Sequence, residues 1–536
     1  MGFIFSPVFL EAQECGYVYV TPNGSSAPGS GTRTNPASLA YAMTLLGPGT
    51  NHIRMAAGTY VIHEPLDIPD NCVIEGGFNP ATWVKSNTTP TVIQRSALNP
   101  IGTPGALIAV RAINKSGFRL QDLTINTDNA PGNSVTTYGV YLSGCSNYFI
   151  TRCKINPGNG SNGAPGAPGA PGINGAPGQD GQPGDPQGNC CRAPGAGGSG
   201  SFPGSHAGGM GGWGAQKGGF VVTTVPIINT CVVEPGSEFT NPGGNGQSGS
   251  GPQGGAGGEG GVGLCELTYI NNNCQAQISN HGEPGAPGAD GQPGAPGSAG
   301  VAQIMGGFYI PGTGGQGQQG QHGAGGGGGG GGGAKGCEPA AVDPFTCDTI
   351  YDTSGSGGGG GGGGEGGQGG GGGYGGTGGG GSFCVFVYNN GINGYIQDCV
   401  LNPGQGGIGG PGGPGGPGGQ GGAGGQGGRL GDAPNGINSC NNGEGGNGGP
   451  GGNGGNGGPG GPGSNGVGMA LYQHPGGEPV FLINNYNPGE PPIYVNHFGC
   501  THSDVAIQVN ATGLMNWIFD YAAEPATGFQ AQDTVH

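Results

Sequence analysis

The sequence has few charged residues, few aromatic residues and no long hydrophobic run. Of its 536 residues, 8% are charged and 7% are aromatic, and 13 Lys or Arg stand against 30 Asp or Glu. Nucleic-acid binding needs clustered Lys and Arg, so this sparse, acidic charge argues against a nucleic-acid partner. No run approaches the roughly eighteen apolar residues of a membrane-spanning helix, and we therefore expect no membrane span.

Motifs for metal and cofactor chemistry are also missing. None of the 15 cysteines forms a C-x-x-C pair, which favours an oxidising compartment over a zinc site. No HExxH, nucleophile-elbow or P-loop motif occurs. We therefore expect a secreted, extracellular or cell-surface protein that has no cofactor and is not an enzyme. Residues 1–14, with the apolar stretch Phe3–Leu10, are expected to be the remnant of a signal peptide.

Glycine and proline dominate what is present, with 142 Gly and 46 Pro. Residues 15–157 have ordinary β-strand composition and are expected to form an N-terminal β-helix. Residues 158–468 alternate glycine tracts with short apolar islands, which predicts glycine-rich hairpins alternating with single β-helix strands. Residues 469–536 are again β-like and are expected to form C-terminal β-helix coils. The hydrophobic core is therefore expected to be small and local.

The apolar islands repeat one pattern. Ile150–Gly158 reads ITRCKINPG, Ile228–Gly236 reads INTCVVEPG and Ile396–Gly404 reads IQDCVLNPG. A unit this short cannot bury a core alone, so copies must stack, and stacking in register gives a β-solenoid. The inward row of this solenoid is expected to contain Cys72, Leu123, Cys153, Cys231 and Cys399.

Beside these repeats, the N-terminal part carries YVTPNGSSAPGSGTRTNPASLAYAM (Tyr19–Met43), AAGTY (Ala56–Tyr60) and CVIEGGF (Cys72–Phe78). These stretches resemble right-handed parallel β-helix surface proteins, namely adhesins of Bacteroidota and polymorphic outer-membrane proteins. The resemblance covers roughly the first 160 residues and the later islands. It implies an all-β, right-handed parallel β-helix fold and an extracellular adhesive role.

The glycine tracts keep a period of three. Gln405–Arg429 and Glu444–Pro462 follow G-G-X, while Gly160–Gly184 and Gly282–Gly300 follow G-X-Y. This period matches an extended left-handed helix with three residues per turn, in which glycine marks a face that touches another backbone. The tracts thus predict a polyglycine II bundle with the G-G-X legs inside. They resemble the polyglycine II bundles of phage tail-fibre tip adhesins and of snow flea antifreeze protein.

The tracts are expected to pair into out-and-back hairpins. One leaves at Pro157, turns near Cys190 and returns to Phe220; the others span 312–381 and 405–462. Glycine legs have no side-chain core, so disulfides would stabilise their tips. The candidate tip cysteines are Cys190, Cys191, Cys337, Cys347 and Cys440.

The tips also hold the side chains that the legs lack, and loops on rigid scaffolds commonly carry recognition. The expected partner is a cell-surface glycan or protein receptor, or further copies of the chain in a filament. The candidate tip-binding residues are Asp343, Phe345, Asp348, Tyr351, Asp352, Arg429, Asp432 and Asn435.

Three alternatives remain open. The G-A-P repeats also suit a collagen-like trimeric fibre, although the tracts are short and interrupted. Flat repetitive faces suit an ice-binding protein, although the free positions carry Gln, Asn, Glu and Pro instead of Thr rows. Asn126-Thr127-Asp128 and Arg152-Cys153-Lys154 match two motifs of polygalacturonases, so a polysaccharide-acting β-helix enzyme is the third alternative, although that family's Asp-Asp and Gly-His-Gly elements are missing.

Overall fold

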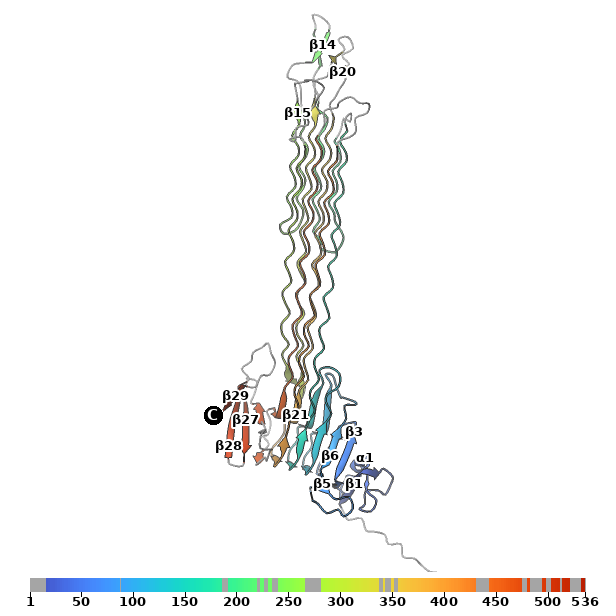
Figure 1. Cartoon of the computed structure of the whole chain (residues 1–536), viewed down its shortest axis with the longest axis vertical. Helices are drawn as coiled ribbons and strands as arrows, with labels where there is room; N and C mark the ends of the chain where they lie inside the picture. Colours follow the sequence, from blue (N-terminus) through green and yellow to red (C-terminus); the bar gives the residue numbers. More distant parts are fainter. Residues whose placement is uncertain are drawn as a thin grey trace, which may run out of the picture.

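The computed structural model consists of a β-sheet base and a long glycine-rich shaft that projects from it (Figure 1). Strand β21 (Ser382–Tyr388) belongs to the base, whereas β14 (Thr230–Val233) lies at the far end of the shaft. The structure describes residues 16–474 except 87, 186–190, 219–221, 226–229, 234–239, 266–280, 337–340, 343–348, 351–354 and 430–442, and beyond them 480–482, 494–497, 503–510, 513–520 and 532–535.

Three large sheets form the base, and successive passages of the chain add one strand to each sheet. The strands of two neighbouring coils, 106–127 and 136–156, pair parallel and in register. The next coil, 382–401, follows a long glycine-rich region yet pairs directly with 136–156. The prediction of an all-β chain with parallel sheets is confirmed, and the stacking is that of a parallel β-helix.

The 7-stranded sheet consists of β1 (Tyr17–Ser25), β2 (His52–Ala56), β5 (Val73–Phe78), β8 (Arg119–Gln121), β11 (Tyr148–Thr151), β22 (Gly394–Gln397) and β25 (Val480–Leu482). The 5-stranded sheet consists of β3 (Gly58–Ile62), β6 (Thr91–Arg95), β9 (Thr124–Thr127), β12 (Lys154–Asn156) and β23 (Val400–Leu401). The 9-stranded sheet consists of β4 (Leu66–Asp67), β7 (Ala106–Ile113), β10 (Thr136–Ser143), β21, β24 (Gly468–Gln473), β26 (Tyr494–His497), β27 (Ser503–Asn510), β28 (Gly513–Asp520) and β29 (Gln532–Val535). Strands β26 to β29 pair antiparallel, so the stretch 469–536 leaves the parallel pattern after β26. The short helix α1 (Leu39–Thr44) precedes β2.

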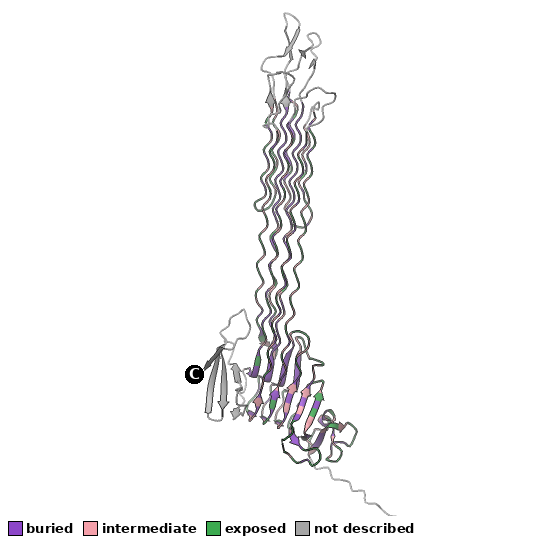
Figure 2. Ribbon diagram, in the orientation of Figure 1, coloured by how far each residue is buried: buried purple, intermediate pink, exposed green. Residues whose placement is uncertain are grey.

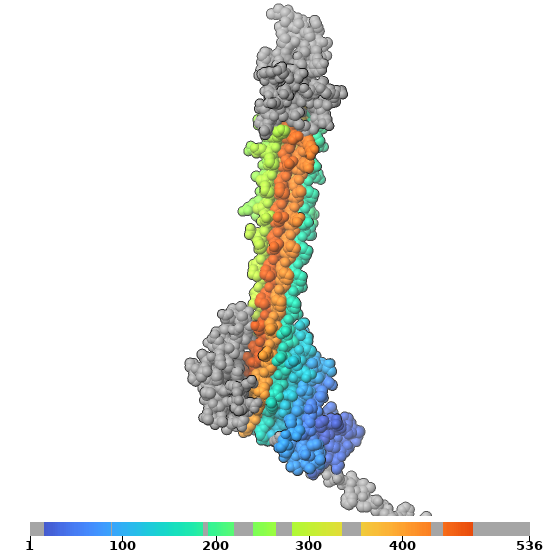
Figure 3. All heavy atoms as spheres, in the orientation of Figure 1, coloured from blue at the N-terminus to red at the C-terminus, as the bar shows by residue number. Residues whose placement is uncertain are grey.

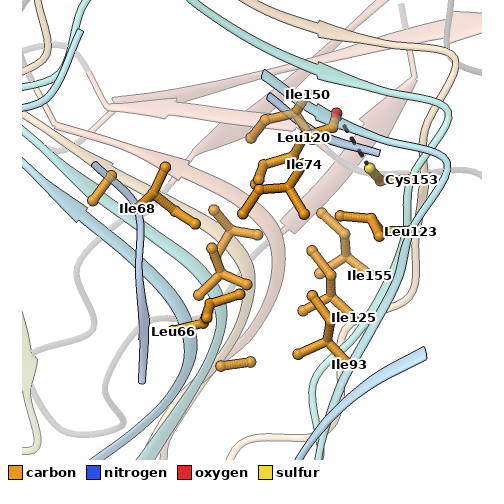
Figure 4. Close-up of a cluster of buried hydrophobic side chains, with 14 of the residues drawn as sticks. Leu66, Ile68, Ile74, Ile93, Leu120, Leu123, Ile125, Ile150, Cys153 and Ile155 are labelled. Carbon is orange, nitrogen blue, oxygen red and sulfur yellow. Dashed lines mark hydrogen bonds between the residues drawn. The ribbon is translucent and has the colours of Figure 1, made fainter. Parts of the chain in front are cut away.

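The core of the base is built from aliphatic ladders. Ile74, Leu120, Ile150 and Ile396 are fully buried and occupy equivalent positions on successive strands of the 7-stranded sheet. Ile125 belongs to a second ladder, with Ile93 and Ile155, which faces this one across the interior (Figure 4). Burying one such side chain contributes roughly 1.5–3 kcal/mol, and register aligns them because one face of each strand is buried.

The shaft is a bundle of extended segments joined by backbone hydrogen bonds. The N–H groups of Gly163, Gly166 and Gly169, three residues apart, donate to the carbonyl oxygens of Ile408, Pro411 and Pro414 at 2.8–2.9 Å. Segments that lie side by side along the shaft come from distant parts of the sequence (Figure 3). The long segments are 157–184, 281–300, 311–334, 356–381, 404–429 and 443–467.

A third layer of short segments thickens the distal half of the shaft. Segments 191–199 and 206–218 are joined by a turn at 200–205, and segments 240–250 and 254–263 are joined by a turn at 250–254. All four are bonded to the long segments; Gly209, for example, donates to Gly326 at 2.8 Å. Below the two turns the shaft has only two layers.

The stretch 325–333 is entirely glycine because it is enclosed on every side. A Cβ atom on Gly327, Gly328 or Gly329 would lie 2.0–2.2 Å from the carbonyl oxygen of Ala256, Met210 or Gly446, respectively, each in a different segment. The interior of the distal shaft is accordingly buried (Figure 2). Nearer the base the third layer is absent. There, every third residue on the same side of this segment is Gln316, Gln319 or His322 instead of glycine.

Side chains on the outside of the shaft complete the backbone bonding. The side-chain Oδ1 atoms of Asn159, Asn162, Asn174 and Asp180 accept from the backbone N–H groups of Gln405, Ile408, Gln420 and Gln426, respectively, at 2.6–2.9 Å. Between these positions Pro165, Pro168 and Pro171 lie beside Pro411, Pro414 and Pro417, which have no N–H to satisfy. Ala423, beside Pro177, departs from this matching.

An aromatic cluster joins the base and the shaft. The hairpin of β16 (Gln303–Met305) and β17 (Phe308–Ile310) connects segments 281–300 and 311–334 and packs on the 9-stranded sheet. The hydroxyl of Tyr141 donates to Gly307 O at 3.0 Å, and its ring stacks on Phe308 with centroids 4.9 Å apart. The Tyr309 N–H donates to the hydroxyl of Tyr138, also at 3.0 Å. These contacts attach the hairpin between two shaft segments to the 9-stranded sheet of the base.

Candidate functional site

Two of the predicted tip residues, Cys191 and Arg429, are among the described residues. Arg429 is exposed at the end of segment 404–429. Cys191 is half-buried, and its sulfur accepts from Gln216 Nε2 at 3.4 Å. The following lie outside the described residues: Cys190, Cys337, Asp343, Phe345, Cys347, Asp348, Tyr351, Asp352, Asp432, Asn435 and Cys440. The tip disulfides and the tip-binding surface therefore stay predictions.

The predicted solenoid row falls at different places. Leu123, Cys153 and Cys399 are buried at equivalent positions of successive coils, where Lys154 N donates to Leu123 O and Val400 N donates to Cys153 O. Cys72 is also buried, but it lies at the opposite end of its strand, where Arg119 N donates to Cys72 O at 2.8 Å. The thiols of Cys72 and Cys153 are free, and burial raises the pKa of Cys72 to about 12.

Cys231 does not belong to that row. It lies in β14, which pairs antiparallel with β13 (Val222–Val225) at the distal end. Segment 191–199 runs back only as far as the turn at 200–205, and 206–218 then runs outward again, so the predicted return to the base at Phe220 is wrong. The short repeat INTCVVEPG suits a strand in the base as well as one at the distal end. The repeat itself does not indicate that the chain reverses at the turn 200–205. Further strands of the distal end are β15 (Leu264–Cys265), β18 (Lys335–Gly336), β19 (Ala341–Val342) and β20 (Thr349–Ile350).

A second candidate site is a charged cluster on the outer face of the 7-stranded sheet. Lys85 forms ion pairs with both Glu75 and Asp122. Arg152 binds Asp122 through two hydrogen bonds, each 2.7 Å long. His52 Nε2 lies 3.2 Å from the Glu75 carboxylate. The side chain of Asp122 is 4% exposed and that of Glu75 is 16% exposed, so the pairs are largely shielded from water.

The two carboxylates of this cluster are held in the ionised form. The hydrogen bond with His52 and the ammonium of Lys85 lower the pKa of Glu75 to about 2, although burial acts in the opposite direction. Burial alone would raise the pKa of Asp122, but hydrogen bonds from Arg152, Lys85 and Gln121 bring it below its usual range. The cluster therefore holds two ionised carboxylates that are already paired with Lys85 and Arg152.

Sequence reasoning missed this cluster although the repeat contains its signal. Asp122, Arg152 and Asp398 occupy the same position in successive copies of the unit, LQDL, ITRC and IQDC. Opposite charges at one repeat position predict ion pairs between stacked coils.

Among the described residues, no group of three or more His, Cys, Asp or Glu side chains is placed to hold a metal ion. Likewise, the described part of the chain contains no helix that is long and apolar enough to span a bilayer.

No protein-family model matches this chain, and no curated protein matches it in sequence. Two solved structures are similar to part of it. A rhamnogalacturonan lyase matches at 15% identity and a TM-score of 0.19, over 27% of this chain and 42% of its own. A pectin methylesterase from Aspergillus niger matches at 14% identity and a TM-score of 0.17, over 27% of this chain and 51% of its own. The chain thus spans about half or less of either protein.

These matches correct one prediction. The absence of catalytic motifs predicted that the chain is not an enzyme, but the similar structures are a lyase and an esterase. The inference failed because it rested on missing motifs, whereas function depends on the geometry of a site and not on a motif or a fold. No adhesin family is matched.

Proposed function

We propose that this chain is an extracellular structural and adhesion protein. A right-handed β-helix base carries a polyglycine II shaft, and the shaft holds its distal end away from the base toward a cell-surface glycan or protein receptor. The observation that carries the proposal is the enclosed glycine stretch 325–333, because it commits a costly, side-chain-free interior to a stiff projecting rod. At about 3.1 Å per residue, segment 404–429 alone extends about 80 Å.

The outside of the shaft favours a single projecting rod over a filament built by lateral growth. In segments 404–429 and 443–466, two glycine phases face neighbouring segments, and the third phase faces outward. That outward phase carries side chains such as Ile408, Gln420 and Asn453 instead of glycine. A second copy could not approach these faces as closely as the segments approach one another, which supports a lattice that ends within one chain.

The test is binding of the purified chain to cells and to a glycan array. Replacing Phe345 and Tyr351 by Ala should reduce binding at least tenfold, because aromatic side chains commonly anchor interfaces. The matched control replaces Ile408 and Tyr374, exposed on the shaft, by Ala and should leave binding unchanged. Equal loss in both variants, or in neither, would reject recognition by the distal end.

The second candidate function is that of a polysaccharide-acting enzyme. The observation that favours it is the cluster of Glu75, Lys85, Asp122 and Arg152 on an outer sheet face, where a linear acidic polymer could lie across several coils. Incubation with pectin and rhamnogalacturonan, followed by detection of new reducing ends or released methanol, tests it. Turnover that Glu75→Gln abolishes would support an enzyme, whereas absence of turnover at any pH would remove this candidate.

A further inference from the structure

The shaft becomes thicker at the turns 200–205 and 250–254, where the third layer ends. A polar cluster that includes His206, His322 and Glu365 lies at this level. Ser201 N, in the turn 200–205, donates to the Glu365 carboxylate at 3.2 Å. In the turn 250–254, Gly251 lies against the ring of His206, where a Cβ atom would be 2.5 Å from Cγ. Both turns that end the third layer therefore rest on this cluster.

His322 lies at the centre of the cluster and is neutral. Its Nδ1 accepts the Gly369 N–H at 3.0 Å. A backbone N–H can only donate, so this nitrogen carries no proton while the bond exists. The ring packs against Phe202 at 5.1 Å and against His206 at 6.2 Å between centroids. Phe202 belongs to the turn 200–205, and His322 thereby links that turn to segment 356–381.

The other titratable groups of the cluster oppose a charge on His322 or are already engaged. His206 Nδ1 lies 2.8 Å from the carbonyl oxygen of Gly323, and a bond to a carbonyl requires that this nitrogen carry the proton. Glu365 accepts from Ala176 N at 2.8 Å and from Ser201 N. Burial, together with the charge that His206 would carry, lowers the pKa of His322. Burial would raise the pKa of Glu365, but hydrogen bonds from Ser201, Ser205 and Ala176 lower it, so it remains ionised in mild acid.

We propose that this step is an acid-sensitive joint. Protonation of His322 breaks its bond with the Gly369 N–H and releases the ring that packs against Phe202 and His206, so that in mild acid the turns 200–205 and 250–254 loosen. The two-layer shaft stays intact because Gly320 N and Gly323 N still donate to Gly370 O and Gly367 O at 2.9 and 2.8 Å. The sign follows from linkage: a base that is harder to protonate when folded destabilises the local structure as pH falls below its unfolded pKa of about 6.5. Loosening is local because the third layer ends here and its other segments are bonded farther out.

The sequence provides a matched control for this joint. Gln316 and Gln319 precede His322 in the same phase, and their Nε2 groups donate to Gly372 O and Gly369 O at 3.3 and 3.2 Å. Glutamine therefore fits this phase of the lattice, and at position 322 its Oε1 can accept the Gly369 N–H without titrating. His322→Gln is accordingly expected to fold and to remove the pH response.

The experiment is hydrogen–deuterium exchange of the full chain at pH 7.5 and pH 5.0, compared as protection factors. In the wild type, protection in 200–208 and 250–256 should fall by a factor on the order of ten at pH 5.0, while 404–420 stays unchanged. His322→Gln should show no fall. The proposal is overturned if the wild type shows no local loss, if 404–420 loses protection equally, or if His322→Gln responds as the wild type does. His206→Gln is measured alongside and should reduce the loss of protection at pH 5.0. This second variant provides the test if His322→Gln folds poorly.

Discussion

The base and the shaft are held together by opposite means. The base buries large side chains: Ile150 lies between its sheets, and Tyr138 and Phe386 lie under the hairpin of β16 and β17. The shaft excludes side chains from its interior and brings backbones together, so its N–H and C=O groups satisfy one another. A β-helix coil tolerates an altered side chain if the volume is kept, whereas an enclosed glycine segment tolerates none. The comparison predicts different sensitivities in the two regions.

The largest effect is expected from a side chain placed inside the shaft. Gly329→Val puts a Cβ atom 2.0 Å from Gly446 O, and no rotamer relieves this contact with backbone. We expect at least about 3 kcal/mol of destabilisation confined to the shaft. Ala423→Val, in the outward phase of segment 404–429, is the control and should change stability by less than about 0.5 kcal/mol. Exchange measurements that show equal loss for both would contradict the enclosed packing.

The next effect belongs to the base. Ile150→Ala removes a fully buried side chain from the aliphatic ladder and should cost about 2–5 kcal/mol of unfolding free energy. Thr151→Ala, on the outward side of the same strand, should cost less than about 1 kcal/mol. Denaturant unfolding followed by circular dichroism compares the two, and similar midpoints would argue against the ladder as the core.

The β-sheet base of the molecule should lose folding stability in a lower pH range than the joint of the shaft does. Because the pKa of Glu75 is lowered to about 2, its contribution is complete above the unfolded pKa of about 4.3 and is lost as pH falls toward 2. We expect a loss of about 2–3 kcal/mol in that window, since the side chain is 16% exposed. Glu75→Gln should flatten the pH dependence of stability between pH 5 and pH 2; an unchanged slope would remove this assignment.

The smallest effect tests the matching of amide and proline along the shaft. Asn174→Pro removes the acceptor of the Gln420 N–H, and Gln420→Pro removes that donor. Together they reproduce the Pro165 and Pro411 arrangement, so the double variant should be more stable than the sum of the single changes by about 0.5 kcal/mol. Thermal unfolding of the four proteins gives the coupling, and additivity would show that the matching has no energetic role.

Much of this architecture could be predicted from the sequence, because both regions have a simple period. The repeat around Ile150 and Ile396 gave the stacked coils, and the G-G-X phase gave the facing of segment 404–429. The glycine pattern contains two further signals. The uninterrupted glycines 325–333 correspond to a segment enclosed on all sides, and His322 lies where this enclosure ends.

The features that the sequence did not predict depend on contacts between residues far apart in the chain. Cys231 could not be assigned to the distal end because its unit, INTCVVEPG, matches the coil unit, and only the turn at 200–205 redirects the chain. The cluster of Glu75, Lys85 and Asp122 required the register of coils and the path of the loop that carries Lys85. The aromatic contact of Tyr141 with Phe308 joins strand β10 of the base to the hairpin between two glycine segments, and no local pattern relates them.

The central claim is that one chain folds back on itself to make the shaft. Small-angle X-ray scattering combined with light scattering tests it most directly on the intact protein. We predict a monomer of 51.8 kDa with a thin rod about 80 Å or more in length attached to a compact base. A trimer, or a monomer whose glycine region scatters as a flexible coil, would contradict the account.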